Sequence, residues 1–171
     1  MNCGYCGGLQ VEGMTLAELV NRDFNRARRR SILERLTRRL RGVLSGNRLV
    51  CFAEERGRKD LVERKDLGIQ AVELAKVEGS VGRCGDFDPA FMPVCSCLGE
   101  RWRRVDLAFR ENKQLPPVRL YKLGVRYFVE DGNHRVSVAR YKDLPMIEAE
   151  VTELLYDEAK AAADNESGGE R

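Results

Sequence analysis

The chain has 171 residues, of which 43% are hydrophobic and 33% are charged. A chain of this length can bury one core but not two, so we expect one domain with appended segments. The net charge of +3 is too small to indicate a nucleic-acid-binding protein by itself. The sequence has neither a run of about 18 apolar residues nor an apolar secretory signal, so we expect a cytoplasmic protein without a membrane partner.

The cysteines are expected to be reduced thiols, because cytosolic redox buffers keep such groups unpaired. They are therefore candidates for metal or redox chemistry. The pairs Cys3/Cys6 and Cys95/Cys97 could together supply four thiolates for zinc, but only the first pair has the usual two-residue spacing. Free thiols are the expected state, and a zinc site is not predicted. The six cysteines are Cys3, Cys6, Cys51, Cys84, Cys95 and Cys97.

After a flexible segment rich in cysteine and glycine (1–14), the sequence predicts a long basic amphipathic helix over 15–46. Thr15 and Glu18 have the spacing of a capping box, so the helix should begin there. Apolar residues then recur mostly at steps of three and four, which gathers them on one side of the helix. They are Leu16, Leu19, Val20, Phe24, Ala27, Leu33, Leu36, Leu40 and Val43.

The same helix carries nine arginines between Arg22 and Arg41, against two acidic residues. These arginines could lie along the phosphates of DNA, although nothing here resembles a helix-turn-helix motif. The alternative is a solvated helix that packs on the domain or on a second copy of the chain, which would give a homodimer. The candidate DNA contacts are Arg28, Arg29, Arg30, Arg38 and Arg39.

A charged connector (47–68) should lead into the main domain (69–155), which a partly disordered tail (156–171) follows. In the connector, 48–52 could form a short strand, and 56–68 is expected to be a loop or an exposed helical turn. The domain pattern indicates a strand at 69–73, a turn at 78–83, a bend at 86–89, a helix at 98–111, a hairpin of 116–121 with 127–129, a helix opened by Asn133, and a strand at 145–151. On the 98–111 helix, the arginines at 101, 103, 104 and 110 should stay solvated. This order predicts an α+β fold, with a small mixed sheet and packed helices.

The residues most indicative of function form the segment Asp131-Gly132-Asn133-His134-Arg135. A strand that passes through Asp-Gly directly into a helix directs free backbone N–H groups at one point, which makes an anion site. Gly132 allows close approach of a ligand, Arg135 can fork onto phosphate oxygens, and His134 adds a donor or a proton shuttle. Asp131 would hold Mg²⁺ or act as a general base. In the alternative, Asp131 caps the helix and His134 fills the core.

This segment, together with Leu115-Pro116-Pro117-Val118, Tyr127-Phe128-Val129 and Ile147-Glu148-Ala149-Glu150-Val151, resembles the ParB/sulfiredoxin superfamily over roughly 69–152. The subgroup that is most similar has the turn Asp-Gly-His-His-Arg, in which Asn133 replaces the first histidine. In sulfiredoxins the corresponding residue is a cysteine that attacks the phosphorylated sulfinate, so Asn133 argues against sulfiredoxin chemistry. In ParB proteins the similar turn binds the triphosphate of CTP, and only Gly132 and Arg135 match it.

The resemblance implies that a nucleoside di- or triphosphate binds at Gly132, Asn133, His134 and Arg135, with Arg83 closing over it from the opposite side. Our leading hypothesis is a nucleotide- or phosphate-binding regulatory protein that acts in DNA-associated regulation. One alternative is a small-molecule kinase, phosphotransferase or nucleotide hydrolase related to free serine kinase, with Asp131 and His134 as catalytic residues. Another is a non-enzymatic DNA-binding accessory protein.

Overall fold

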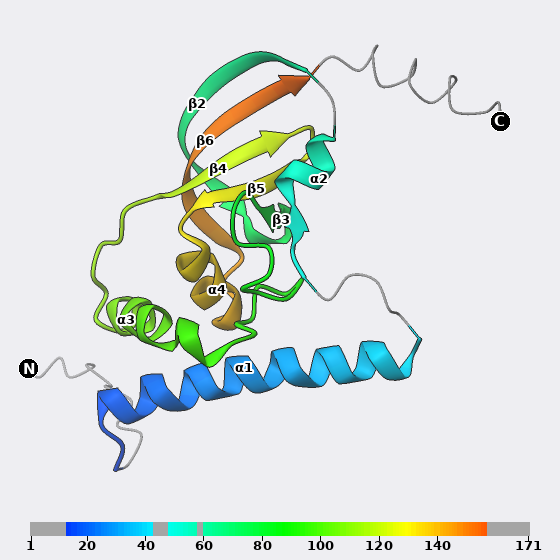
Figure 1. The fold of residues 1–171 in the computed structure, drawn as a ribbon. Coiled ribbons are helices and arrows are strands. Elements are labelled where there is room, and N and C mark those ends of the chain that lie inside the picture. The colour runs from blue at the N-terminus through cyan, green and yellow to red at the C-terminus, as the bar shows by residue number, and fades with distance from the viewer. Residues whose placement is uncertain (1–12, 43–47, 58–59, 157–171) are drawn as a thin grey trace, which may run out of the picture.

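The computed structural model describes residues 13–42, 48–57 and 60–156, and these form one six-stranded mixed sheet with helices packed on it. The strands follow the order β1-β3-β5-β4-β6-β2 across the sheet. Figure 1 shows α1, α3 and α4 gathered on one side of the sheet, with α1 furthest from it. The helices are α1 (Leu16–Leu40), α2 (Phe52–Arg56), α3 (Gly99–Arg110) and α4 (Asn133–Tyr141). The strands are β1 (Val50–Cys51), β2 (Leu61–Glu73), β3 (Val77–Ser80), β4 (Val118–Leu123), β5 (Arg126–Asp131) and β6 (Met146–Tyr156).

The strand pairing confirms the predicted α+β class. β3 pairs in parallel with β1 and β5, and β4 pairs in parallel with β6, whereas the β4–β5 and β2–β6 pairs are antiparallel. Parallel neighbours cannot be joined by a tight turn, and the connection between the parallel strands β4 and β6 runs through β5 and α4. None of the described helices has the length and apolar character needed to cross a membrane. The predicted N-terminal segment and C-terminal tail lie outside the described residues.

Several local predictions are confirmed. The Thr15 hydroxyl accepts a hydrogen bond from the Glu18 amide at 3.3 Å, and the Glu18 carboxylate accepts one from the Thr15 amide at 2.7 Å. The predicted helix at 98–111 is α3, the hairpin is formed by β4 and β5, and the helix opened by Asn133 is α4. The closing strand, β6, extends to Tyr156 and so is longer than the expected 145–151.

The interpretation of 56–68 as a loop or helical turn is wrong. β2 begins at Leu61 and runs without interruption to Glu73, across the expected boundary at residue 69. Its charged side chains remain in water because β2 lies at the edge of the sheet and pairs only with β6. The predicted turn at 78–83 also begins too early, since β3 continues to Ser80. Backbone pairing with distant strands decides both segments, and the local composition does not reveal it.

The sequence predicted that the apolar residues of α1 share one side of the helix, and this prediction is wrong. Val20, Phe24 and Ala27 are buried against the domain, where Phe24 stacks at 5.7 Å on the Trp102 ring of α3. The later leucines at 33, 36 and 40 are exposed instead. The helix therefore docks through its N-terminal half. Val43 lies outside the described residues.

A network of buried charges fixes α1 and α3 to the end of α4. The Asp106 carboxylate of α3 is fully buried and pairs with Lys142 at 2.6 Å and with Arg110 at 3.2 Å. Arg110 also binds Asp23 of α1, which is buried as well. Beside this network, the Trp102 indole N–H donates to the Ser137 hydroxyl of α4 at 2.9 Å. Three helices are thus joined by polar contacts that burial makes costly to break.

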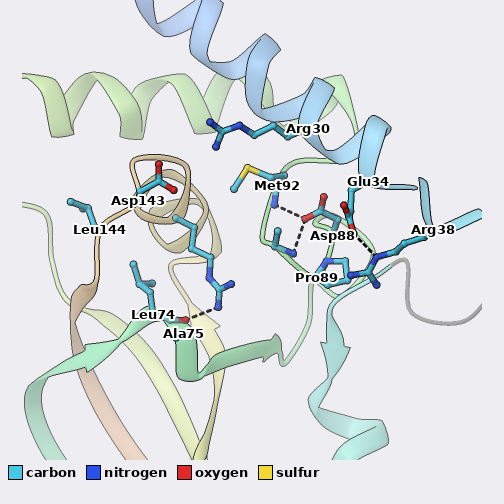
Figure 2. A pocket seen from close by; sticks show the side chains of 12 residues that line it. Arg30, Glu34, Arg38, Leu74, Ala75, Asp88, Pro89, Met92, Asp143 and Leu144 are labelled. Carbon is cyan, nitrogen blue, oxygen red and sulfur yellow. Dashed lines mark hydrogen bonds and ion pairs between the residues drawn. The ribbon is translucent and has the colours of Figure 1, made fainter. Parts of the chain in front are cut away.

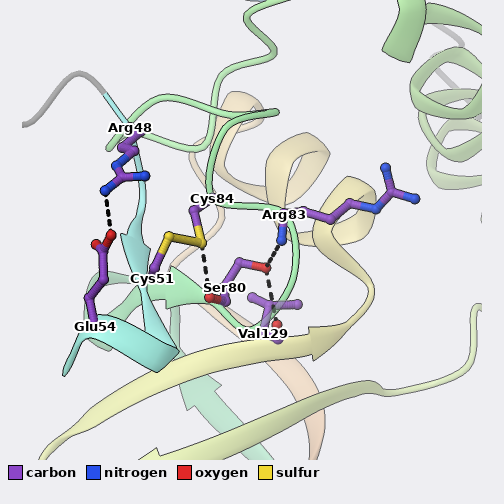
Figure 3. Close-up of a disulfide and its surroundings, with 7 residues drawn as sticks. All are labelled: Arg48, Cys51, Glu54, Ser80, Arg83, Cys84 and Val129. Atoms are coloured by element: carbon purple, nitrogen blue, oxygen red, sulfur yellow. Dashed lines mark hydrogen bonds and ion pairs between the residues drawn. A yellow bond between two sulfur atoms is a disulfide. The ribbon is translucent and has the colours of Figure 1, made fainter. Parts of the chain in front are cut away.

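Four cysteines form disulfides, so the expectation of unpaired thiols is wrong for them. Cys51 at the end of β1 is joined to Cys84 in the loop after β3 (Figure 3), and Cys95 is joined to Cys97. Pairing of β1 beside β3 brings the Cα atoms of Cys51 and Cys84 to 5.4 Å, although the residues lie 33 apart in the chain. The remaining pair of the zinc hypothesis, Cys3 and Cys6, lies outside the described residues.

We expect Asp106→Ala to lower the free energy of unfolding by about 3 kcal/mol, because the Arg110 and Lys142 charges lose their shared buried partner. Urea denaturation followed by tryptophan fluorescence measures this change. Glu100→Ala is the matched control on the same helix, since Glu100 pairs with Arg104 at 2.7 Å on the exposed side. That variant should change stability by less than about 0.5 kcal/mol. Equal effects of the two substitutions would show that the buried network does not hold the helices.

Candidate functional site

The strand-to-helix turn at Gly132 has the geometry that the sequence predicted. β5 ends at Asp131, Gly132 adopts a φ of 101°, and α4 begins at Asn133. A Cβ atom at Gly132 would lie 2.6 Å from Cγ1 of Val118, so both the backbone conformation and the close packing require glycine. The first amides of α4 have no acceptors within the helix and carry the positive end of its dipole.

Arg135 holds this turn together from within the protein. One of its terminal nitrogens donates to the carbonyl of Pro117 at 2.9 Å and also to the carbonyl of Pro116. Its other terminal nitrogen donates to the Asp131 carboxylate at 2.8 Å. The side chain is 13% exposed. Most of the guanidinium is therefore occupied by the protein, and Arg135 positions the turn more than it reaches toward a ligand.

Asn133 and His134 are each 7% exposed and carry polar atoms without partners. Oδ1 of Asn133 and Nδ1 of His134 are buried without a hydrogen bond, which in a folded protein calls for a ligand or an ordered water. The His134 ring packs edge-on against Phe87 at 5.4 Å. These two side chains form the floor of a cavity at the start of α4.

The pKa of His134 is lowered from 6.5 to about 4, mainly by burial and also by the nearby Arg101 and Arg83 charges, against the opposing effect of Asp86. The imidazole is therefore neutral at pH 7. A base with a pKa this low is poorly matched to proton transfer near neutral pH, so the structure offers no support for His134 as a general base.

The cavity has a volume of about 540 Å³ and a rim rich in arginine. Arg83 comes from the loop after β3, Arg101 and Arg104 come from α3, and Arg135 comes from α4. Arg83 pairs with Asp86 at 2.7 Å and lines the same cavity as the α4 turn. Figure 3 shows Arg83 next to Cys84, with its backbone amide donating to the Ser80 hydroxyl.

The sequence missed Arg101 and Arg104 as site residues. The sequence predicts that they stay solvated, and they are indeed exposed, but they also line the cavity. The burial of Trp102 fixes the rotation of α3. That rotation could be predicted from the sequence, but the proximity of α3 to the turn could not.

The carboxylates near the cavity are already paired. Glu130 accepts a hydrogen bond from the Tyr121 hydroxyl at 2.6 Å and pairs with Arg119 at 3.5 Å, while Asp131 is held by Arg135. Among the described residues, no three His, Cys, Asp or Glu side chains gather where they could hold a metal ion. The assignment of Mg²⁺ and of a catalytic role to Asp131 stays a prediction.

The five arginines predicted to contact DNA do not form one surface. Arg29 and Arg39 are exposed, whereas Arg28 is half-buried. Arg30 lies 5.0 Å above the Tyr141 ring, and Arg38 pairs with Glu34 at 2.8 Å. The positions of these arginines do not test whether the protein binds DNA, so DNA binding stays a prediction.

A second cavity, of about 630 Å³, lies between α1, the 88–92 loop and the C-terminal end of α4 (Figure 2). Much of its polar lining is taken up by the protein. Asp88 accepts from the amides of Ala90 and Met92 at 2.9 and 2.8 Å, and Arg140 donates to the carbonyls of Leu74 and Val77. Burial raises the pKa of Asp88. Oδ2 of Asp88 and Nε of Arg140 are buried without a partner here as well. The cavity at the start of α4 is the smaller of the two, but it combines such buried groups with the N-terminus of a nine-residue helix.

No protein-family model matches the chain, and no curated protein is similar to it in sequence. Among solved structures, the sulfiredoxin of Arabidopsis thaliana matches with 17% sequence identity. The match covers 48% of this chain and 82% of the sulfiredoxin, with a TM-score of 0.37. The likeness concerns the fold alone, and membership of the superfamily stays a prediction.

We expect Gly132→Ala to destabilise the protein by roughly 2–3 kcal/mol, because it combines a strained positive φ with the clash against Val118. Gly124→Ala is the matched control. Gly124 also has a positive φ, of 59°, but a Cβ there would meet nothing within 4 Å. Its cost should be about 1 kcal/mol. Thermal unfolding of both variants measures the difference, and equal losses would mean that the close approach to Val118 is unimportant.

His134 is the only histidine in the chain, so its NMR signals report on this one site. We expect its titration to give a pKa of about 4. His134 in the unfolded chain would titrate near 6.5. Between pH 4 and 6.5 the unfolded chain therefore binds more protons than the folded protein. The free energy of unfolding should therefore fall as the pH is lowered through this window, by on the order of 3 kcal/mol in total. His134→Gln should lack this component, and a measured pKa near 6.5 would contradict the burial of a neutral ring.

Proposed function

We propose that this protein is a member of the ParB/sulfiredoxin superfamily that binds a phosphorylated ligand at the start of α4, namely a nucleoside di- or triphosphate with or without Mg²⁺. The observation that carries the proposal is the pair of buried groups without partners, Asn133 and His134, at a helix N-terminus beneath an arginine rim. Helix amides and a rim of guanidinium groups favour an anion. Buried polar atoms without partners are costly unless a ligand or water satisfies them.

The size and charge of the cavity favour a polyphosphate over a single small anion. A volume of about 540 Å³ lies within the range of sites for drug-sized ligands. Arg83 comes from the loop after β3, and Arg101 and Arg104 come from α3, so the cavity offers guanidinium groups from two segments to several phosphates. Guanidinium groups bind phosphate through paired, charge-assisted hydrogen bonds.

Binding is better supported than catalysis. A phosphotransferase would need Asp131 or His134 to take a proton from an acceptor, but Asp131 is paired with Arg135 and His134 has a low pKa. A product assay with ATP or ADP and hydroxyl-bearing acceptors tests the enzymatic alternative. The proposal also includes a role in DNA-associated regulation, and only the resemblance in sequence supports this part.

The direct test is calorimetric titration with pyrophosphate, ADP, ATP, CTP and GTP, each with and without Mg²⁺. We expect Arg101→Ala to weaken binding by about tenfold or more, because one charge-assisted contact is lost. Arg101 is exposed, so the variant should fold. Arg56→Ala is the matched control, since Arg56 is an exposed arginine of α2 that does not line the cavity. Arg135→Ala would be ambiguous, because it also removes the contacts to Pro116 and Pro117.

The sole histidine provides a second, independent measurement. A bound polyphosphate offsets the Arg83 and Arg101 charges that lower the pKa of His134, so that pKa should rise on ligand addition. Binding that leaves both the His134 titration and the Arg101→Ala affinity unchanged would place the ligand elsewhere. Absence of binding by every nucleotide and by pyrophosphate at about 1 mM would refute the proposal.

A further inference from the structure

The C-terminal half of α1 carries a second row of apolar side chains that faces solvent. The exposed fractions are 41% for Ile32, 61% for Leu33, 52% for Leu36 and 87% for Leu40, and we call these four residues the leucine row. At about 100° per residue, Leu36 and Leu40 lie on roughly the opposite side of the helix from the buried Val20 and Ala27. The helix thus has two apolar sides, and only one of them packs on the domain.

The position of the row explains why the domain does not cover it. Figure 1 shows α1 running along the side of the molecule, with its C-terminal half extending past α3 and α4. A groove of about 180 Å³ on this half is lined by Ile32, Arg35, Leu36 and Arg39, all of which belong to α1 itself. Apolar side chains gathered on an exposed helix in this way mark an interaction surface.

The charge around the leucine row is strongly positive. Residues 28–41 carry seven arginines and one glutamate, although Arg30 and Arg38 line the cavity between α1 and the domain. Arg35 and Arg39 directly border the apolar groove. A partner must therefore combine apolar side chains for the row with negative charge for the arginines beside it.

We propose that the leucine row is the docking surface for an acidic amphipathic helix of another protein. Leu33, Leu36 and Leu40 follow the three-and-four spacing of the a and d positions of a coiled coil, and Arg39 occupies a g position beside them. In a coiled coil the flanking e and g charges select the partner, so a helix with apolar a and d residues and glutamates at e and g fits this surface.

Three other partners fit less well. A second copy of this chain would place its own arginines against these, with one glutamate per copy to offset them. Binding to a lipid surface grows with the apolar area that a helix buries, and this row covers only residues 32–40, about two and a half turns. DNA would satisfy the arginines, but it would leave the leucines against a phosphate backbone.

The test uses the full chain and a labelled synthetic peptide of about three heptads, with leucine at a and d and glutamate at e and g. A second peptide carries lysine in place of each glutamate. We expect the acidic peptide to bind in fluorescence anisotropy, more weakly as salt rises, and the basic peptide not to bind. Leu36→Gln/Leu40→Gln should weaken binding at least about tenfold. Val125→Gln is the matched control, since Val125 is 79% exposed in the β4–β5 turn, and it should leave binding unchanged.

Charge reversal tests the specificity. Arg35→Glu/Arg39→Glu should lose the acidic peptide and gain the basic one. Equal binding of both peptides, or binding of neither at about 1 mM, would overturn the proposal. A dimer in sedimentation that Leu36→Gln/Leu40→Gln dissociates would assign the row to a second copy and overturn it as well. Binding to phosphatidylserine vesicles or to duplex DNA would also overturn the proposal if Leu36→Gln/Leu40→Gln abolished it.

Discussion

The geometry of the candidate site depends on the guanidinium of Arg135. Arg135 lies in the first turn of α4, which follows β5. Its guanidinium binds the carbonyls of the Pro116–Pro117 segment before β4 and the carboxylate at the end of β5. Three chain segments therefore meet at one planar group with several donors, which a lysine could not replace. Gly132 completes the arrangement, because its positive φ turns the strand into the helix within one residue. The amides of α4 are thereby held in place before any ligand arrives.

The electrostatics of the site follow from this fixed frame. Because Arg135 already satisfies Asp131, the carboxylate does not repel an anion as strongly as a free one would. The rim arginines come from elsewhere, and their charges help to keep His134 neutral. The site thus joins neutral buried groups at its floor to cationic groups at its rim. Such an arrangement suits an anion that is partly desolvated, whose charge the rim balances.

Local sequence patterns predicted the elements that depend on local interactions. The capping box at Thr15, the α3 helix, the β4–β5 hairpin and the Gly132 turn all follow from the nearby residue types. The misses share another cause, which is dependence on residues far away in the chain. β2 is charged and reveals itself only by pairing with β6, and the Cys51–Cys84 disulfide joins the end of β1 to the loop after β3, which the sequence does not place together. The role of Arg135 rests on backbone carbonyls, to which the residue pattern gives no guide.

The same edge strand that the sequence missed has a consequence for the behaviour of the protein at high concentration. An unpaired sheet edge offers backbone groups to other chains and so favours aggregation. One edge here is β1, only two residues long, and the other is β2, which is rich in charge and whose pairing with β6 shifts register around Gly68. Short, charged and irregular edges resist such stacking. The backbone of this sheet is thereby protected from growing into fibrils, and recognition by other molecules is left to side chains.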